Sequence, residues 1–432
     1  MSKKLSEIPE NKSSEKSIDI VRRGMVSRYR AEKRFRLYGI FSVIVTILFL
    51  GVLFVGIGSK GFSAFQQTYV RLEVYLDPEP FESLESSVDY PGLIKNALRS
   101  EFPEVKSRRD KKELYQLVSS GASFQLRDLV RENSRVIGKT ISIWVPADDD
   151  VDMYLKGHFT GNSDGAGRLS ENQLGWIQKW VAEKRVEKRF NKAFFINGDS
   201  REPEQAGILG ALTGSILTIG LTVLFSFPIG VATAVYLEEF APKNRWIDFV
   251  EVNINNLAAV PSIVFGLLGL AVFINFFNFP RSSSLVGGLV LSLMTMPTII
   301  IAGRASIQSV PPSIREAALG IGASPMQTVL QHVLPLALPG ILTGTIIGMA
   351  RALGETAPLL MIGMVAFIVD IPHGVTDPAT VLPVQVYLWA DSPERAFTER
   401  TSAAIMVLLA FLVAMNSVAV WLRHKMEKKS SG

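Results

Sequence analysis

The sequence predicts a mainly α-helical polytopic membrane protein with about six transmembrane helices and one soluble α+β insert. Hydrophobic residues fill 48% of the 432 positions, more than a soluble composition would suggest once the mean hydropathy is also positive. Apolar runs long enough to span a bilayer, which takes about 20 residues, recur along the chain. The six expected spans are residues 37–58, 209–236, 254–277, 285–301, 336–364 and 403–421.

Basic residues flank the first and last spans. The segment 1–36 carries eleven Lys and Arg, and the tail 423–432 carries four more. Such residues concentrate on the cytoplasmic side of membrane helices, so both termini are expected in the cytoplasm, which an even number of spans requires. The leader is too long for a signal peptide, so the first span, 37–58, is expected to remain as an uncleaved anchor. The net charge of +5 then indicates membrane topology rather than binding of nucleic acid.

Residues 59–206 differ in kind from the rest of the chain. Lys/Arg and Asp/Glu occur there in nearly equal numbers beside short apolar patches, which is typical of one folded soluble domain. One span after a cytoplasmic N-terminus, this insert is expected in the periplasm. Its charged stretch 174–195 predicts an amphipathic helix, because apolar residues recur at helical spacing. The remaining block, 207–422, is expected to hold the other five spans.

Two patterns in the insert suggest ligand sites and are discounted. The tripeptide Gly-Lys-Thr at 138–140 ends like a P-loop, but the first glycine of that motif is missing and a strand is expected to follow. Asp148, Asp150 and Asp152 alternate like calcium ligands without the loop glycine or closing glutamate, so a solvated acidic turn is expected. Zero cysteines remove thiol catalysis and thiolate metal sites. We expect no enzyme activity, no catalytic or metal site, and no cofactor in this chain.

A long loop, 303–335, separates the fourth and fifth spans on the expected cytoplasmic side. Ser313 with Glu316, and Ser324 with Gln327, have the spacing of two capping boxes. Two short capped helices are therefore predicted, the second ending just before the fifth span. A link of this length inside a compact block usually has a function, and we interpret it as a docking element rather than a plain connection.

Arg351 and Glu355 are the two charges in the apolar stretch 336–369. A charge in hydrocarbon costs at least about 2.5–3.5 kcal/mol, so an idle pair is unexpected. Their spacing lets them pair on one helix face. Gly354 and Pro358 disfavour a continuous helix at the same place. Arg351 lies roughly 22 Å along the span, past the midplane of a core about 30 Å thick. Its guanidinium suits an oxyanion, while Glu355 either holds the arginine or repels the anion; a structural salt bridge is the alternative.

Two further features of the block are open to functional and structural interpretations. Arg304, just after the fourth span, is a second candidate for guiding an anion, although a basic flank is equally well explained by membrane topology. Gly340, Gly344 and Gly348 repeat at four-residue steps. They favour close helix packing, either within the chain or at the interface with a partner subunit.

Two motifs in this block resemble the inner-membrane permeases of binding-protein-dependent ABC importers. Glu316-Ala317-Ala318, with Gly322 and the later Leu-Pro at 334–335, resembles their EAA loop, although a histidine at 332 replaces the family isoleucine. The run R-A-L-G-E-T-A-P at 351–358 resembles the phosphate permeases of the PstA family. This resemblance implies the ABC importer permease fold over 207–432. It also implies that Glu316, Ala317 and Gly322, with the capping residues Ser313 and Ser324, couple the loop to a separate ATPase.

The resemblance further implies a phosphate importer in the bacterial inner membrane. This chain would form half of the pathway, past Arg351 and Glu355, within the lipid bilayer. A second permease subunit, an extracytoplasmic phosphate-binding protein and a cytoplasmic ATPase dimer that binds the ATP would be its partners. The alternatives are a permease for another oxyanion or small solute, and a stand-alone channel or ion-coupled carrier gated by the pair. A stand-alone channel or ion-coupled carrier needs no docking element for an ATPase, so the two-helix loop argues against that alternative. The sequence does not choose a role for the insert.

Overall fold

One long helix, α1 (Lys12–Ala64), begins the part of the chain that the computed structural model describes, namely residues 12–82, 88–157, 169–364 and 367–430. The helix contains the expected first span and continues without a break through most of the basic segment before it. The chain divides into two compact units, Met1–Ser59 and Lys60–Gly432. The packing described below lies within the second unit.

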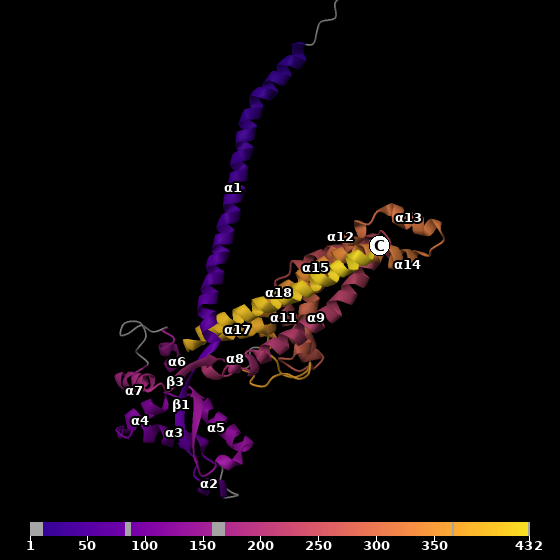
Figure 1. The fold of residues 1–432 in the computed structure, drawn as a ribbon. Coiled ribbons are helices and arrows are strands. Elements are labelled where there is room, and N and C mark those ends of the chain that lie inside the picture. Colours follow the sequence, from indigo (N-terminus) through magenta and orange to yellow (C-terminus); the bar gives the residue numbers. More distant parts are fainter. Residues whose placement is uncertain (1–11, 83–87, 158–168, 365–366, 431–432) are drawn as a thin grey trace, which may run out of the picture. The chain divides into compact units, whose positions relative to one another are not determined.

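A three-stranded antiparallel sheet forms the centre of the insert, which confirms its α+β character. The strands are β1 (Gln66–Tyr75), β2 (Thr140–Pro146) and β3 (Val186–Phe190), in the order β2-β1-β3. Alternate residues of β1, namely Val70, Leu72 and Val74, are fully buried on one face, as the period of two in a strand requires. β2 confirms the strand expected after the P-loop-like tripeptide. Figure 1 shows β1 and β3 among the short helices of the insert.

Short helices surround this sheet. They are α2 (Glu79–Glu82), α3 (Tyr90–Glu101), α4 (Arg108–Tyr115), α5 (Gly121–Glu132), η1 (Ser134–Val136), α6 (Asp149–Leu155), α7 (Glu171–Ala182), α8 (Lys192–Ile196) and η2 (Pro203–Gln205). The apolar sides of α2 to α7 and η1 share one core with the sheet, in which Phe102, Leu126 and Trp180 are almost fully buried, whereas α8 packs against the spans. The insert therefore has a hydrophobic core of its own.

The single helix predicted over 174–195 is wrong. Helix α7 ends at Ala182, the backbone turns at Lys184, whose φ is +55°, and β3 follows. Val186 of β3 pairs with Val70 of β1. The charges that suggested a solvated helix surface lie on an edge strand, where charged side chains are common because they prevent further strand pairing.

The transmembrane block consists of helices joined by short irregular segments. They are α9 (Leu209–Val235), η3 (Tyr236–Phe240), α10 (Arg245–Ala258), α11 (Ser262–Gly269), η4 (Leu270–Phe276), α12 (Ser284–Gln308), α13 (Pro312–Gly320), α14 (Pro325–Thr328), η5 (Val329–Val333), α15 (Leu334–Gly354), α16 (Ala357–Met361), α17 (Leu382–Ala390) and α18 (Ala396–Ser430). Five helices among the described residues are long and apolar enough to cross a membrane, or six if the bent pair of α10 and α11 counts as one span.

The direction of α9 and α12 supports the count of six. Gly287 of α12 lies beside Thr218 near the start of α9, and Gly303 lies beside Ala234 near its end, so the two helices run parallel. The chain leaves α9 at one end of the bundle and begins α12 at the other. The intervening segment, with α10 and α11 bent by 102°, must therefore carry it back across. The expected third span exists as this bent pair rather than as one straight helix.

Helix α15 runs antiparallel to α12 and packs closely against it (Figure 1). A Cβ at Gly340 would overlap the Ser306 side chain, and one at Gly344 would overlap Ala302. The glycine repeat therefore serves packing within this chain, and the suggested partner interface is wrong for these two positions. The predicted fifth span is too long: α15 ends at Gly354, because the next residue turns to an extended conformation.

Candidate functional site

Arg351 and Glu355 lie at the end of α15 and form an ion pair there. The Arg351 Nε and Glu355 Oε1 atoms are 3.5 Å apart, and the two side chains are 49% and 19% exposed. Arg351 lies in the last turn of the helix, while Glu355 is the extended residue that follows it. The helix therefore breaks at Gly354, between the two charges. Because half of the arginine remains exposed, its other guanidinium donors are available to a ligand.

The pair lies at the end of the bundle that also carries the insert. Helix α15 begins at Leu334, 17 residues before Arg351, which corresponds to about 26 Å of helix. It runs antiparallel to α9, whose first residue, Leu209, donates a backbone hydrogen bond of 3.1 Å to Asn197 at the end of α8. Arg351 is thus far from the loop between α12 and α15 and near the level where the insert joins the spans.

Arg304 lies within α12, one turn before its end, and not after it as the sequence suggested. Its Nε lies 3.4 Å from Glu238 Oε2 and its Nη2 lies 2.8 Å from Glu251 Oε1, with 22% of the side chain exposed. Two carboxylates therefore balance its charge. Ala302 faces Gly344, seven residues before Arg351, so the two arginines lie at least about 10 Å apart along the bundle. The structure does not bring them into one site.

The loop between α12 and α15 contains two helices, but only the second begins with a capping box. Helix α13 starts at Pro312 with Pro311 before it and no side-chain cap. Ser313 lies inside its first turn, so the predicted first box is wrong. The second is confirmed: Gln327 N donates to Ser324 Oγ over 3.3 Å, and Ser324 N donates to Gln327 Oε1 over 2.9 Å.

The second loop helix does not end before the fifth span, as was expected. Helix α14 continues through the π-helical turn η5 directly into α15, giving one helical element, Pro325–Gly354. Pro335 lies inside this element, directly after η5, where the Leu334 amide already bonds five residues back to the Val329 carbonyl and the α-helical hydrogen-bond pattern is interrupted. A displacement of α14 is therefore passed along a continuous helix toward Arg351.

The loop exposes the side chains that were assigned to coupling. Glu316 and Ala317 are exposed on α13, while the next residue, Ala318, is buried against the bundle. Gly322 has a φ of +89°, a left-handed conformation that glycine adopts without steric cost. This turn lets α13 end and α14 begin within four residues. Large apolar side chains are also exposed on this surface, and they are Leu319, Ile321, Met326 and Leu330.

Arg315 fixes α13 to the ends of two spans, a role that sequence reasoning missed. Its Nη2 lies 2.7 Å from Glu239 Oε1, at the end of α9. The same guanidinium donates to the carbonyl oxygens of Ile307 and Val310, at 2.9 and 2.8 Å, which lie at the end of α12. Arginine commonly binds terminal helix carbonyls in this way. The sequence signal was the pair Glu238-Glu239 directly after an apolar span.

A buried ion-pair group connects the insert to α18, and it was also missed. Lys156 Nζ lies 2.7 Å from Asp152 Oδ2 in the insert and 2.8 Å from Glu399 Oε1 in α18, and the Lys156 side chain is 5% exposed. Asp152 Oδ1 also accepts a hydrogen bond of 2.8 Å from Thr68 N of β1. The sequence signal was the adjacent charged pair Glu399 and Arg400 just before the last apolar run.

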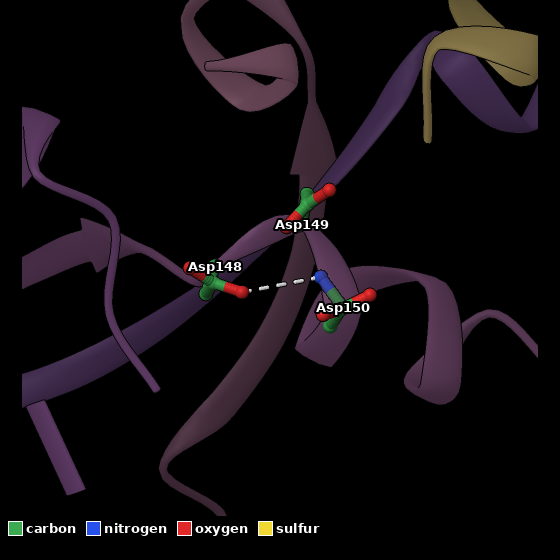
Figure 2. A group of neighbouring side chains, drawn as sticks. All are labelled: Asp148, Asp149 and Asp150. Atoms are coloured by element: carbon green, nitrogen blue, oxygen red, sulfur yellow. Dashed lines mark hydrogen bonds between the residues drawn. The ribbon is translucent and has the colours of Figure 1, made fainter. Parts of the chain in front are cut away.

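The acidic turn differs from the alternating set that the sequence suggested. Asp148, Asp149 and Asp150 gather at the start of α6, where Asp148 accepts a hydrogen bond from Asp150 N over 3.2 Å (Figure 2). Asp152 binds Lys156 instead. The turn is half-buried rather than solvated. Burial, followed by the nearby charges of Asp149 and Glu204, raises the pKa of Asp148 to about 9.

The chain is similar to membrane proteins of known transport systems. Residues 226–428 match a family model described as "Binding-protein-dependent transport system inner membrane component", and residues 22–164 match a domain of unknown function, DUF3333. Phosphate transport system permease protein PstA 1 of Mycobacterium tuberculosis is 33% identical over 225 residues, covering 51% of this chain and 72% of that protein. The probable ABC transporter permease protein YqgI of Bacillus subtilis is 30% identical, covering 52% and 80%. PstA of Haemophilus influenzae is 29% identical, covering 51% and 78%.

Proposed function

We propose that this chain, which belongs to the family of binding-protein-dependent transport system inner membrane components, is the permease subunit of a phosphate importer. Its family makes it a multi-pass ABC importer permease, a transport subunit rather than an enzyme. The choice of phosphate is supported by relatives that are named phosphate transport permeases at about 30% identity. It is also supported by the half-exposed guanidinium of Arg351 in an otherwise apolar helix.

The observation that carries the proposal is the connection from the exposed loop to the ion pair. Arg315 ties α13 to the ends of α9 and α12, and α14 continues into α15. An ATPase that pushes on the exposed surface around Glu316, Ala317 and Gly322 therefore moves three spans together. Because α15 carries Arg351 near its far end, the motion reaches the charged pair through one helical element, in which η5 and Pro339 are the points where it can bend.

The chemistry of the pair fits transient handling of an anion. A guanidinium presents paired N–H donors to a phosphate oxyanion, and a desolvated site strengthens those bonds. Glu355 is an acceptor when ionised and cannot bind the anion directly. It orients Arg351 while the pathway is empty and weakens retention of the anion once bound. The phosphate crosses without covalent change.

The same proposal assigns the sides of the membrane and the partners. The loop end of the bundle faces the cytoplasm, together with both termini of the chain, and the insert faces the periplasm across the bacterial inner membrane. A second permease completes the pathway, two copies of an ATPase bind the loops and the ATP, and a phosphate-binding protein delivers the anion. A contradicting result would be purification of the chain from native membranes without any ATPase.

Phosphate uptake by cells carrying variants of the pair tests the substrate assignment. Arg351→Gln is expected to abolish most uptake, and Arg351→Lys to restore only part, because an ammonium keeps the charge but not the paired donors. Glu355→Gln is expected to alter the rate while the protein remains in the membrane. Arg127→Gln, at an exposed arginine of the insert, is the control. Normal uptake by both Arg351 variants would refute the pathway role.

Competition measurements address the alternative substrates. Excess sulfate or another oxyanion should leave phosphate uptake unchanged if the site is built for phosphate, and should suppress it if the chain serves a different oxyanion. Uptake that continues after ATP is depleted, driven by an ion gradient, would favour the stand-alone carrier instead. These results distinguish the three functions without any change to the chain.

A further inference from the structure

Large apolar side chains are exposed where the insert meets the spans. Phe62 at the end of α1 is 66% exposed, Phe190 at the end of β3 is 60% exposed, and Ile196 at the end of α8 is 60% exposed. Phe195 links them, because its ring stacks on Phe190 with centroids 5.4 Å apart. Phe65 in turn joins Phe62 to Phe195, with centroid distances of 6.0 and 5.5 Å. We call Phe62, Phe190, Phe195 and Ile196 the phenylalanine patch.

The patch is fixed to the ends of the spans. Phe194, which directly precedes the exposed Phe195 and Ile196, is fully buried and its ring lies 6.3 Å from Trp389 of α17. The Asn191 side-chain amide donates to the carbonyl oxygen of Ala64 over 3.0 Å. At Gly61, a Cβ would come within 3.1 Å of the Ala403 backbone nitrogen in α18. The buried side of this segment is thus part of the membrane block, while its other side carries the patch.

Two independent measures put the patch at the level of the lipid headgroups. The carbonyl oxygens of Phe194 and Asn197 accept hydrogen bonds from the amides of Ile208 and Leu209, at 2.8 and 3.1 Å, so α8 lies beside the first turn of the α9 span. Phe62 lies two residues before the end of the apolar candidate span Arg28–Ala64. The interfacial layer on each side of the hydrocarbon is itself about 5–7 Å thick.

We propose that the phenylalanine patch lies in the interfacial layer of the bilayer and fastens the insert to the lipid surface. Aromatic side chains are enriched in this layer, and an apolar surface at that depth is stabilised by contact with acyl chains. Lys188 and Lys192, which are exposed on either side of Phe190, are positioned to bind lipid phosphates. The inference depends only on the chain crossing a membrane and is independent of the transported solute.

Fluorescence quenching at single cysteines tests the depth of the patch. The chain has no native cysteine, so Phe190→Cys, Phe195→Cys and Ile196→Cys each give one labelling site in the full-length protein. Each variant is labelled with bimane and reconstituted in phosphatidylethanolamine–phosphatidylglycerol liposomes. Two quenchers are compared: phosphatidylcholine with a doxyl group near the headgroup, and aqueous iodide. Tyr75→Cys is the matched control, because this exposed aromatic lies at the far end of β1, about 30 Å along the strand.

The expected result is quenching by the doxyl lipid and protection from iodide at the patch, with the opposite at position 75. Quenching by iodide at the patch as strong as at position 75 would overturn the proposal, because the patch would then be in water. Protection from both quenchers would also overturn it, because protein and not lipid would then cover the patch. Three separate positions keep the test valid if one variant fails to fold.

Discussion

Two arginines in apolar helices have contrasting surroundings. Arg304 is largely enclosed and balanced by Glu238 and Glu251, whereas Arg351 is half exposed and contacts Glu355 over 3.5 Å. An arginine that already binds two carboxylates has little capacity for a passing anion. Arg351 keeps most of its donors free, so the two residues are expected to respond differently to removal of the charge.

Arg304→Gln is expected to destabilise the protein more than it changes the apparent affinity for phosphate. The substitution leaves two partly buried carboxylates without their cation, at a cost of about 1–3 kcal/mol. Thermal unfolding should therefore shift downward while the KM of uptake stays unchanged, and adding Glu251→Gln should recover part of the loss. A raised KM with unaltered stability would instead support the guiding role expected from the sequence.

Asp148 is expected to make the stability of the insert depend on pH. Its pKa is raised from 3.8 to about 9 in the fold, so the folded state binds the proton more tightly than the unfolded state between those values. Stability from this group is present below pH about 4 and is lost progressively as the pH rises toward 9. Glu204, which faces Asp148, adds to the effect, because burial raises its own pKa to about 7.

Asp148→Asn should remove this dependence while keeping the helix cap, since asparagine caps as well as aspartate. The variant is expected to be more stable than the natural protein at pH 8.5, by at least about 1 kcal/mol, the equivalent of one pKa unit, and similar to it near pH 4. Thermal unfolding of the purified protein across this range provides the measurement. Equal gains at both pH values would mean that the proton is not the cause.

For single residues, sequence reasoning found the charged side chains that lie within apolar sequence. It did not find the charged side chains whose partners are distant in the chain. Arg351 and Glu355 stood out because a charge in an apolar run is costly. Arg315 lies 76 residues from Glu239, and Lys156 lies 243 residues from Glu399. Neither cation conflicts with its local sequence, so only the fold reveals that each one connects two elements.

At the scale of elements, the two loop helices begin in different ways and provide a matched pair of variants. Ser324→Ala removes the side-chain cap of α14 and should cost about 1 kcal/mol of local stability. Ser313→Ala changes a residue that does not cap α13 and should have little effect. Hydrogen exchange in the loop measures both: amides of α14 should exchange faster in the first variant only. If Ser313→Ala accelerates exchange in α13 as much as Ser324→Ala does in α14, then Ser313 caps α13 and the first capping box exists.

Apolar runs predicted where the spans are, but not where they bend or stop. The break between α10 and α11 falls at 259–261, where Pro261 precedes α11, and α15 ends at Gly354, the place where Gly354 and Pro358 had been expected to weaken the helix. Hydropathy does not distinguish a straight helix from a bent one, because both bury the same side chains. Likewise, Pro335 suggested a helix end, yet the helix continues through it, directly after the π-helical turn η5. Backbone direction depends on packing against α12 and on other tertiary contacts.

At the scale of the whole molecule, a buried group of ion pairs connects the insert to the spans. Lys156 lies between Asp152 of the insert and Glu399 of α18 with 5% of its side chain exposed. Removing Lys156 from this buried group leaves Asp152 and Glu399 with one cation fewer. Arg400, which is buried beside them, would then be left to offset their charge. We therefore expect the insert to move together with α18. A flexible connection between the two would let them move independently.

Lys156→Met tests this connection, because methionine keeps the length of the side chain without its charge. Loss of the cation should destabilise the protein by about 3–5 kcal/mol and make the insert more susceptible to limited proteolysis. Adding Glu399→Gln removes one of the two carboxylates that lose Lys156, so the double variant should be more stable than Lys156→Met alone. Lys106→Met, at an exposed lysine of the insert, is the control and should change stability by less than about 0.5 kcal/mol. If Lys156→Met behaves like that control, the insert is held by the apolar contacts of its helix α8 with α17, and movements of α18 do not reach it through this ion pair.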